Sequence, residues 1–160
     1  MSISAHIVER ILRVLDRVGA RFGRKDERSE TAIVGARGEE AAYFHLRHHG
    51  YTVVARNYRS PRTRGELDLV AWDGEILCFI EVKTRTKHDF APAESAVDPE
   101  KRKDLRRIAR EYLRHLPGVS TRLRSGMKAE LPDTRFDVVS VYLLPDQPTE
   151  IELRKSAFGW

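Results

Sequence analysis

Apolar side chains recur along the chain at helical spacing in three places. Residues 35–49 carry alanines and aromatic residues at this spacing, and Gly50 is a typical residue just past a helix end. Residues 99–116 repeat apolar side chains every three or four positions, and Pro99 suits a first helical turn. Residues 3–18 show a continuous apolar stripe. The pattern therefore predicts three amphipathic helices.

Between these helices lie short segments rich in β-branched and aromatic residues. Proline and glycine separate the segments, as expected for strands joined by turns and loops. The order along the chain after residue 31 is helix, three strands, helix, two strands, which predicts an α/β fold. The predicted strands cover residues 51–58, 66–72, 75–85, 135–144 and 150–155.

The two central strands predict a hairpin with a cluster of charged side chains. Asp73–Gly74 is a preferred dipeptide for a two-residue turn, and this turn would place Glu66 opposite Glu81. Asp68 would then lie on a diagonal roughly 7–8 Å from Glu81. Because strand side chains alternate, both residues share a face with Glu66 and Lys83, whereas the opposite face is almost wholly apolar.

This group of three carboxylates and one ammonium has an excess of negative oxygen. Such a ligand set favours Mg²⁺ or Mn²⁺ over softer metals. The alternative is a set of ordinary surface ion pairs at a solvated strand end, which contribute little. Spacing alone leaves both interpretations open. His45 and His49 are four residues apart, but no third zinc ligand is evident, so we interpret them as surface histidines.

The chain of 160 residues is long enough for one ordinary core. We expect residues 1–30 to form an amphipathic helix with a linker, and residues 31–160 to form the main domain. Cys78 is the only cysteine and lies on the apolar face of the hairpin, which predicts a buried, inert thiol. The longest apolar run is too short to cross a bilayer, so we expect a cytoplasmic protein without membrane contact.

Positive charge is concentrated in two segments. The formal net charge is +5, from 29 lysines and arginines against 24 acidic residues. Residues 47–65 contain five arginines and no acidic residue, and the helix over 99–116 contains seven basic residues against three acidic ones. Such segments favour nucleic-acid phosphates, with binding that weakens as salt rises. A solvated helix face is the alternative.

The charged hairpin resembles a known family signature. Residues 65–70 (GELDLV) and 79–85 (FIEVKTR) are similar to the Asp…Glu-x-Lys motif of the PD-(D/E)XK nuclease superfamily. More specifically, the chain resembles the YraN-type family of small bacterial proteins related to Holliday junction resolvases. The resemblance runs from about residue 35 to 141 and includes Gly38-Glu39, Gly50-Tyr51, Arg56-Asn57-Tyr58, Lys101-Arg102 and Arg135-Phe136-Asp137-Val138. It implies a restriction-endonuclease-like fold with a mixed central sheet flanked by helices.

The resemblance also implies roles for individual residues. Asp68 and Glu81 would be metal-binding carboxylates, with the main-chain carbonyl of Val82 as a third ligand, and Lys83 would orient or help deprotonate the attacking water. Glu39 would assist metal binding, and Glu66 is a further catalytic candidate. Leu67 stands where the superfamily motif has proline. The residues expected to contact nucleic acid are Arg56, Arg59, Arg62, Arg64, Arg85, Lys101 and Arg102.

Two functional hypotheses from different classes follow. The first is a nuclease that uses Mg²⁺ or Mn²⁺ to hydrolyse phosphodiester bonds in DNA, with branched or junction DNA as the substrate implied by analogy. The second is a non-catalytic nucleic-acid-binding or assembly protein that retains the nuclease fold. In both cases the expected partner is DNA, and the sequence is also compatible with a homodimer.

Overall fold

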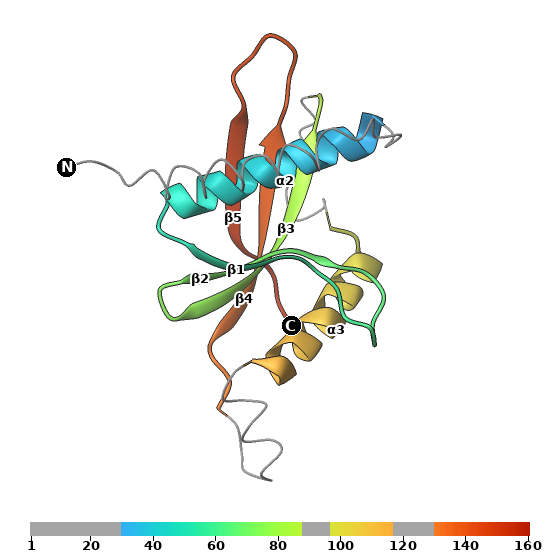
Figure 1. Ribbon diagram of the computed structural model, residues 1–160, viewed down its shortest axis with the longest axis vertical. Helices are drawn as coiled ribbons and strands as arrows, with labels where there is room; N and C mark the ends of the chain where they lie inside the picture. Colours follow the sequence, from blue (N-terminus) through green and yellow to red (C-terminus); the bar gives the residue numbers. More distant parts are fainter. Residues whose placement is uncertain (1–29, 88–96, 117–129) are drawn as a thin grey trace, which may run out of the picture. The chain divides into compact units, whose positions relative to one another are not determined.

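A five-stranded mixed sheet with a helix on each face forms the centre of the protein (Figure 1). This computed structural model describes residues 30–87, 97–116 and 130–160. The chain divides into two units, residues 1–32 and 33–160, of which the second contains the sheet. The elements in chain order are α2 (Glu30–His48), β1 (Thr52–Tyr58), β2 (Leu67–Asp73), β3 (Ile76–Arg85), α3 (Pro99–His115), β4 (Thr134–Tyr142) and β5 (Glu150–Phe158).

The strands lie in the sheet in their sequence order, β1-β2-β3-β4-β5. Neighbouring strands are antiparallel except β3 and β4, which are parallel. Parallel neighbours need a crossover connection, and α3 lies in the segment that joins β3 to β4. The expected α/β architecture with a mixed sheet flanked by helices is confirmed, and it is consistent with a restriction-endonuclease-like fold.

Both faces of the sheet are buried over the central strands β2, β3 and β4, because α2 covers one face and α3 covers the other. The buried cluster on the α2 face comprises Ala42, Leu46, Tyr51, Leu69, Ala71, Cys78, Ile80, Val139 and Val141. The buried cluster on the α3 face comprises Leu67, Val70, Leu77, Phe79, Val97, Leu105, Ile108, Ala109, Leu113, Phe136, Val138 and Ala157. The hairpin face that carries Asp68 and Glu81 is therefore the one that α3 covers. This face is apolar over most of its length and polar only at the end where these two carboxylates lie.

The hairpin register differs from the predicted one by two residues. Asp73 pairs with Ile76, so the turn consists of Gly74 and Glu75 rather than Asp73 and Gly74. Gly74 has a φ of 60°, which glycine adopts without strain at the first central position of a tight turn. A shift by two keeps every side chain on its predicted face, but it changes which residues lie opposite one another.

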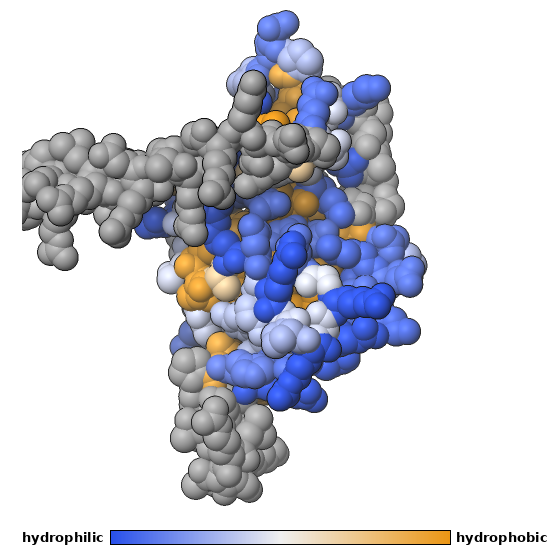
Figure 2. All heavy atoms as spheres, turned by 45° about the vertical axis from the view of Figure 1, so that its right-hand side comes forward, coloured by the Kyte–Doolittle hydropathy of each residue, from blue (hydrophilic) through white to orange (hydrophobic). Residues whose placement is uncertain are grey.

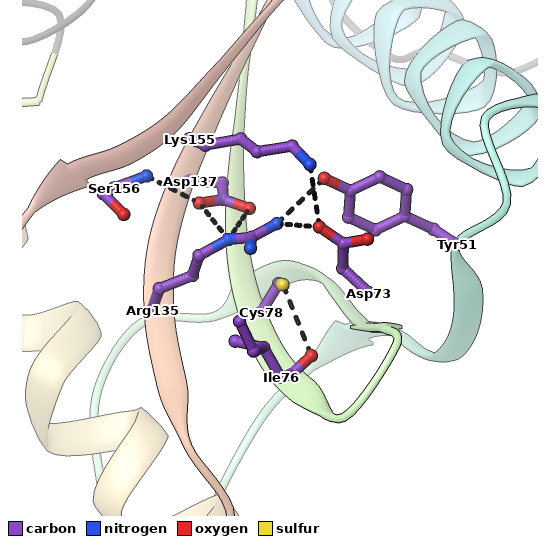
Figure 3. Close-up of polar contacts among 8 residues, drawn as sticks. All are labelled: Tyr51, Asp73, Ile76, Cys78, Arg135, Asp137, Lys155 and Ser156. Carbon is purple, nitrogen blue, oxygen red and sulfur yellow. Dashed lines mark hydrogen bonds and ion pairs between the residues drawn. The ribbon is translucent and has the colours of Figure 1, made fainter.

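A polar network explains why Asp73 belongs to the strand (Figure 3). The Asp73 carboxylate pairs with Arg135 of β4 and accepts a hydrogen bond from Lys155 of β5 at 2.8 Å. Arg135 also donates to both oxygens of the fully buried Asp137, and the Ser156 N–H donates to Asp137 Oδ1 at 2.9 Å. These contacts join three strands, so the two carboxylates have a structural role there.

Two element boundaries also differ from the prediction. Helix α2 includes residues 30–34, because Gly35 is tolerated inside the helix at a cost of about 1 kcal/mol instead of marking its start. Strand β5 continues to Phe158 past a register shift opposite residues 136–138, where Asp137 receives the Ser156 N–H. The predicted N-terminal helix lies outside the described residues, as do most of the segments that join β3 to α3 and α3 to β4.

Candidate active site

Asp68 and Glu81 meet at the end of the β2–β3 hairpin away from its turn. Leu69 pairs with Ile80 at this end of the ladder, so the next step brings Asp68 opposite Glu81. The sequence register had placed Glu66 there and Asp68 on a diagonal. Asp68 and Glu81 are both buried, with 8% and 4% of their surface exposed. The structure thus brings the two carboxylates closer together than the predicted register did.

The Asp68 carboxylate is held in place by the neighbouring strand. Its Oδ2 accepts a hydrogen bond from the Val82 N–H at 2.7 Å. Burial and the nearby negative charge of Glu81 raise the pKa of Asp68 to about 7, although the Val82 N–H favours the charged form. The protein therefore stores unfavourable electrostatic energy here, which a bound cation would relieve.

Two lysines neutralise Glu81 from different elements. Lys83 of β3 places its Nζ 3.0 Å from Glu81 Oε1, and Lys101 of α3 places its Nζ 3.2 Å from the same oxygen. The other oxygen, Oε2, is buried and finds no hydrogen-bond partner among the described residues. A buried carboxylate oxygen without a partner is costly, and it is the kind of ligand that a divalent cation requires.

Lys101 reaches the site because of how α3 begins. Asp98 caps the helix by accepting a hydrogen bond from the Lys101 N–H at 2.8 Å, and Pro99 occupies the first turn as predicted. Burial lowers the pKa of Lys101, but the attraction of Glu81 and Asp68 outweighs it and raises the pKa above its usual value. The side chain is therefore a permanent positive charge beside the carboxylates.

Glu39 approaches the site from α2. Its negative charge is one of the influences that raise the pKa of Asp68. The preceding residue, Gly38, is buried against Thr84 of β3, where a Cβ atom would overlap the threonine side chain. Glycine at this position lets the helix lie close to the strand and so brings Glu39 towards the carboxylates.

Glu66 has a different environment from the one its sequence position predicted. It precedes β2, and its Oε2 accepts a hydrogen bond from Arg59 at 2.7 Å. Glu66 is still near enough to contribute to the raised pKa of Lys101. Its direct partner is thus an arginine that was expected to contact nucleic acid, and it does not lie opposite Glu81.

The geometry restricts which metals fit. The described part of the chain contains no group of three or more His, Cys, Asp and Glu side chains arranged to hold an ion. Zinc and calcium sites ordinarily use more protein ligands than two carboxylates. Mg²⁺, in contrast, is commonly held by one or two carboxylates together with waters and substrate phosphates. Asp68 and Glu81 with its unpartnered oxygen fit that requirement.

The arginines before β2 are exposed but partly engaged with other side chains. Arg56 lies over the Tyr43 ring, 4.6 Å from its centroid. Arg62 Nη1 lies 3.6 Å from Glu111 of α3, and Arg64 is exposed in the same loop. The Glu111 contact holds Arg62 near α3, whereas Tyr43 belongs to α2, so Arg56 lies on the α2 side of the sheet. The side chains of both arginines are themselves exposed.

A row of arginines follows α3 at four-residue steps. Arg102 and Arg106 lie over the Phe158 ring, and Arg110 lies over the ring of Trp160. Arg102 also donates to the Val97 carbonyl at 2.8 Å. Hydrophilic residues dominate the side of the molecule that Figure 2 brings forward, where α3 lies. Arg85 is the last residue of β3, two residues after Lys83.

Sequence reasoning found the two carboxylates and Lys83 but did not assign Lys101 to their site. It had placed Lys101 among the phosphate contacts on a helix that follows β3 by a long connection. The charge pattern of that helix contained no signal for the contact with Glu81. Pro99 indicated the first turn of this helix, but the position of that turn against the sheet depends on tertiary packing.

Cys78 has the environment that the sequence predicted. It is fully buried in the cluster on the α2 face, and burial raises the pKa of its thiol to about 12.

The histidine pair lies at the end of α2. His49 Nδ1 is 2.8 Å from the His45 carbonyl oxygen, so one ring nitrogen of His49 contacts the backbone of the same segment. Over the described residues, no helix is both long enough and apolar enough to cross a membrane.

Comparison with known proteins places the chain among bacterial proteins of similar length. A UPF0102 protein of Koribacter versatilis is 57% identical over 124 residues, which cover 78% of each chain. A UPF0102 protein of Solibacter usitatus is 49% identical and covers 78% of this chain and 84% of its own. A UPF0102 protein of Chlorobaculum tepidum is 40% identical and covers 78% and 91%. The model of the family described as "Uncharacterised protein family UPF0102" matches residues 38–141, and the chain therefore belongs to this family, the YraN-type family that its motifs resemble.

Proposed function

We propose that this protein is a nuclease that hydrolyses phosphodiester bonds in DNA with the help of Mg²⁺ or Mn²⁺. One observation carries the proposal: Asp68 and Glu81 are buried side by side with two lysines, and Glu81 Oε2 has no partner among the described residues. Most buried side-chain oxygens are hydrogen-bonded, and Glu111 Oε1, the other carboxylate oxygen buried without a hydrogen bond among the described residues, lies 3.6 Å from the Arg62 guanidinium. The relation to the PD-(D/E)XK superfamily is part of this proposal, as is branched or junction DNA as the substrate by analogy with the related resolvases.

Each residue of the site has a distinct task in the proposed reaction. Asp68 and Glu81 would hold the metal ion, with the Val82 carbonyl as a further ligand, and Glu39 would assist from α2. When bound, the ion polarises a phosphoryl oxygen and lowers the pKa of a bound water. Lys83 would orient the attacking water and stabilise the additional negative charge of the transition state with its ammonium group.

The surrounding surface supports a polyanionic substrate. Arginines from the loop before β2 and from α3 lie on the side of the sheet on which Lys101 enters the site. Phosphate contacts from such side chains would position a DNA backbone without reading its sequence. The affinity of the protein for DNA should therefore fall steeply as the salt concentration rises.

A cleavage assay tests the proposal. Labelled single-stranded, duplex, flapped and four-way DNA are incubated with the protein in Mg²⁺ or Mn²⁺ and then in EDTA. We expect cleavage of at least one structure, abolished by EDTA and reduced by about 100-fold or more in Glu81→Ala and Lys83→Ala. Glu150→Ala and Lys103→Ala are matched controls, because both replace exposed side chains outside the site.

Two outcomes would contradict the proposal. Equal cleavage by Glu81→Ala and wild type would show that Glu81 is not required for the cleavage. The second outcome is that the protein cleaves no substrate but binds DNA in a salt-sensitive manner, with an affinity that does not change when Asp68 or Glu81 is replaced. That result would support the alternative, a binding or assembly protein that retains the fold, for which the arginine-rich surface alone would be sufficient.

A further inference from the structure

Lys101 occupies a position that the nuclease proposal does not explain. Lys83 already places an ammonium group 3.0 Å from Glu81 Oε1, yet Lys101 places a second one 3.2 Å from the same oxygen. The Lys101 side chain is one-third exposed, whereas that of Glu81 is almost fully buried. Lys101 is thus the partner that can leave this contact for solvent, and Glu81 is the partner that stays.

Both lysine side chains are one-third exposed, but they differ in their attachment. Lys83 extends from the same strand as Glu81, two residues away, so the pair shares one backbone segment. Lys101 comes from the first turn of α3, and its backbone is fixed by the Asp98 cap rather than by the sheet. Its long side chain can therefore turn away from Glu81 without any movement of the sheet, because only rotatable bonds need to change.

We propose that Lys101 is the resident counter-ion of the Asp68–Glu81 pair, and that a divalent cation competes with it and frees it to bind a substrate phosphate. The inference rests on the proposed function, because it assumes that these carboxylates bind a cation. It assigns Lys101 a second ligand, an anionic phosphate group of the substrate. In the metal-free protein the lysine reduces the repulsion between the carboxylates, and in the loaded protein it provides a contact on the substrate side.

Electrostatics sets the size of the competition. An opposite charge within about 4–6 Å of a carboxylate changes the affinity of that carboxylate for a proton by roughly 10- to 1000-fold. Removal of the Lys101 charge should raise the affinity for a divalent cation by about tenfold. This is the lower end of that range, because Lys83 remains beside Glu81. A lysine that only stabilised the site would have the opposite effect, since its loss would loosen the carboxylates and weaken binding of the ion.

The test is a Mn²⁺ titration of the full chain at pH 8.0, followed by the electron paramagnetic resonance signal of free Mn²⁺. We expect Lys101→Met to bind Mn²⁺ about tenfold more tightly than wild type. Lys101→Arg, which keeps the charge, should bind nearly as wild type does. Lys103→Met is the matched control, because it removes a neighbouring exposed lysine, and it should also leave the affinity unchanged.

A second measurement tests the phosphate contact. With Mn²⁺ and a fluorescein-labelled phosphorothioate DNA, which resists cleavage and keeps the negative charge of each phosphate, binding should be several-fold weaker for Lys101→Met than for Lys103→Met. Circular dichroism and melting curves establish that each variant is folded, and Lys101→Gln replaces Lys101→Met if the latter is unfolded.

The outcomes separate this inference from the proposed function. An unchanged or weaker Mn²⁺ affinity of Lys101→Met would overturn the competition, even if the wild-type protein cleaves DNA. Equal DNA affinity of the two methionine variants would overturn the phosphate contact. If wild type and all variants fail to bind Mn²⁺ at millimolar concentration, the metal centre itself is refuted and the inference with it.

Discussion

Replacement of Asp68 by asparagine should make the metal-free protein more stable. Asp68 is buried beside Glu81, and these two influences raise its pKa from 3.8 to about 7. A raised carboxyl pKa means that the folded protein holds the proton more tightly than the unfolded chain does. Ionisation of Asp68 therefore destabilises the folded state, and the free energy of unfolding falls as pH rises from about 4 to about 7.

The structure gives an upper limit for this effect. The shift is about three pKa units, and each unit corresponds to about 1.4 kcal/mol, so the cost at pH 8 is at most about 4 kcal/mol. Asparagine has a similar shape and keeps an oxygen that can accept the Val82 N–H. Its amide nitrogen needs a new partner, which reduces the gain. We expect Asp68→Asn to gain about 2 kcal/mol at pH 8, or roughly 4–8 °C in melting temperature.

The assay is thermal unfolding in EDTA at pH 4 and pH 8, with Asp146→Asn as a control at an exposed turn position. Asp68→Asn should melt well above wild type at pH 8 and close to it at pH 4, where Asp68 is protonated in the folded protein and its ionisation no longer destabilises the fold. A variant that is less stable than wild type at pH 8 would refute the electrostatic reasoning. So would an equal gain at both pH values, because that gain would not come from ionisation.

Three further predictions concern the rest of the fold. Gly38→Ala should lower the free energy of unfolding by about 1–3 kcal/mol in a urea titration, because its Cβ would overlap Thr84. Gly35→Ala in the same helix meets no atom within 4 Å and should be neutral or stabilising by up to about 1 kcal/mol. Equal effects of the two substitutions would contradict the close approach of α2 to β3. Asp73 has its pKa lowered to about 2 by hydrogen bonds from Lys155 and Arg135, so the stability it provides is present above pH 4 and is lost between about pH 4 and 2. Acid titrations of Asp73→Asn should lack this loss, and an unchanged acid transition would contradict it. Cys78 should react with a thiol reagent only at the rate of global unfolding, because its pKa is about 12 and it is buried, so fast modification in native buffer would contradict that environment.

Side-chain periodicity was sufficient to predict the order of the described elements. The two helices and five strands follow from apolar spacing and turn residues, and Gly50 and Pro99 lie where their backbone preferences indicated. The same spacing put Asp68, Glu81 and Lys83 on one face. This shared face was predicted correctly although the turn was assigned incorrectly, because a shift of two residues preserves the alternation of side chains.

The hairpin register could not be predicted from local preferences alone. Asp73–Gly74 is a favourable turn dipeptide, but Asp73 is more stable in the strand, where it meets Arg135 and Lys155 from two later strands. Those partners are more than sixty residues away in the sequence. The resulting shift brought Asp68 opposite Glu81 and left Glu66 to pair with Arg59.

The position of Lys101 is a second feature that depends on tertiary packing. Its helix was predicted correctly, and its charge suggested a phosphate contact on the surface. Only the packing of α3 on the sheet brings the lysine within 3.2 Å of Glu81. The sequence therefore predicts the chemistry of the two strands, but not the residue that reaches their carboxylates from the helix.

The proposed metal centre is tested most directly by a crystal structure of the protein soaked in Mn²⁺, measured for anomalous scattering at the manganese absorption edge. We expect one strong anomalous peak between the carboxylates of Asp68 and Glu81, with the Lys101 ammonium displaced from Glu81. Absence of a peak at these carboxylates, or a peak only elsewhere, such as beside His45 and His49, would contradict the proposed metal centre.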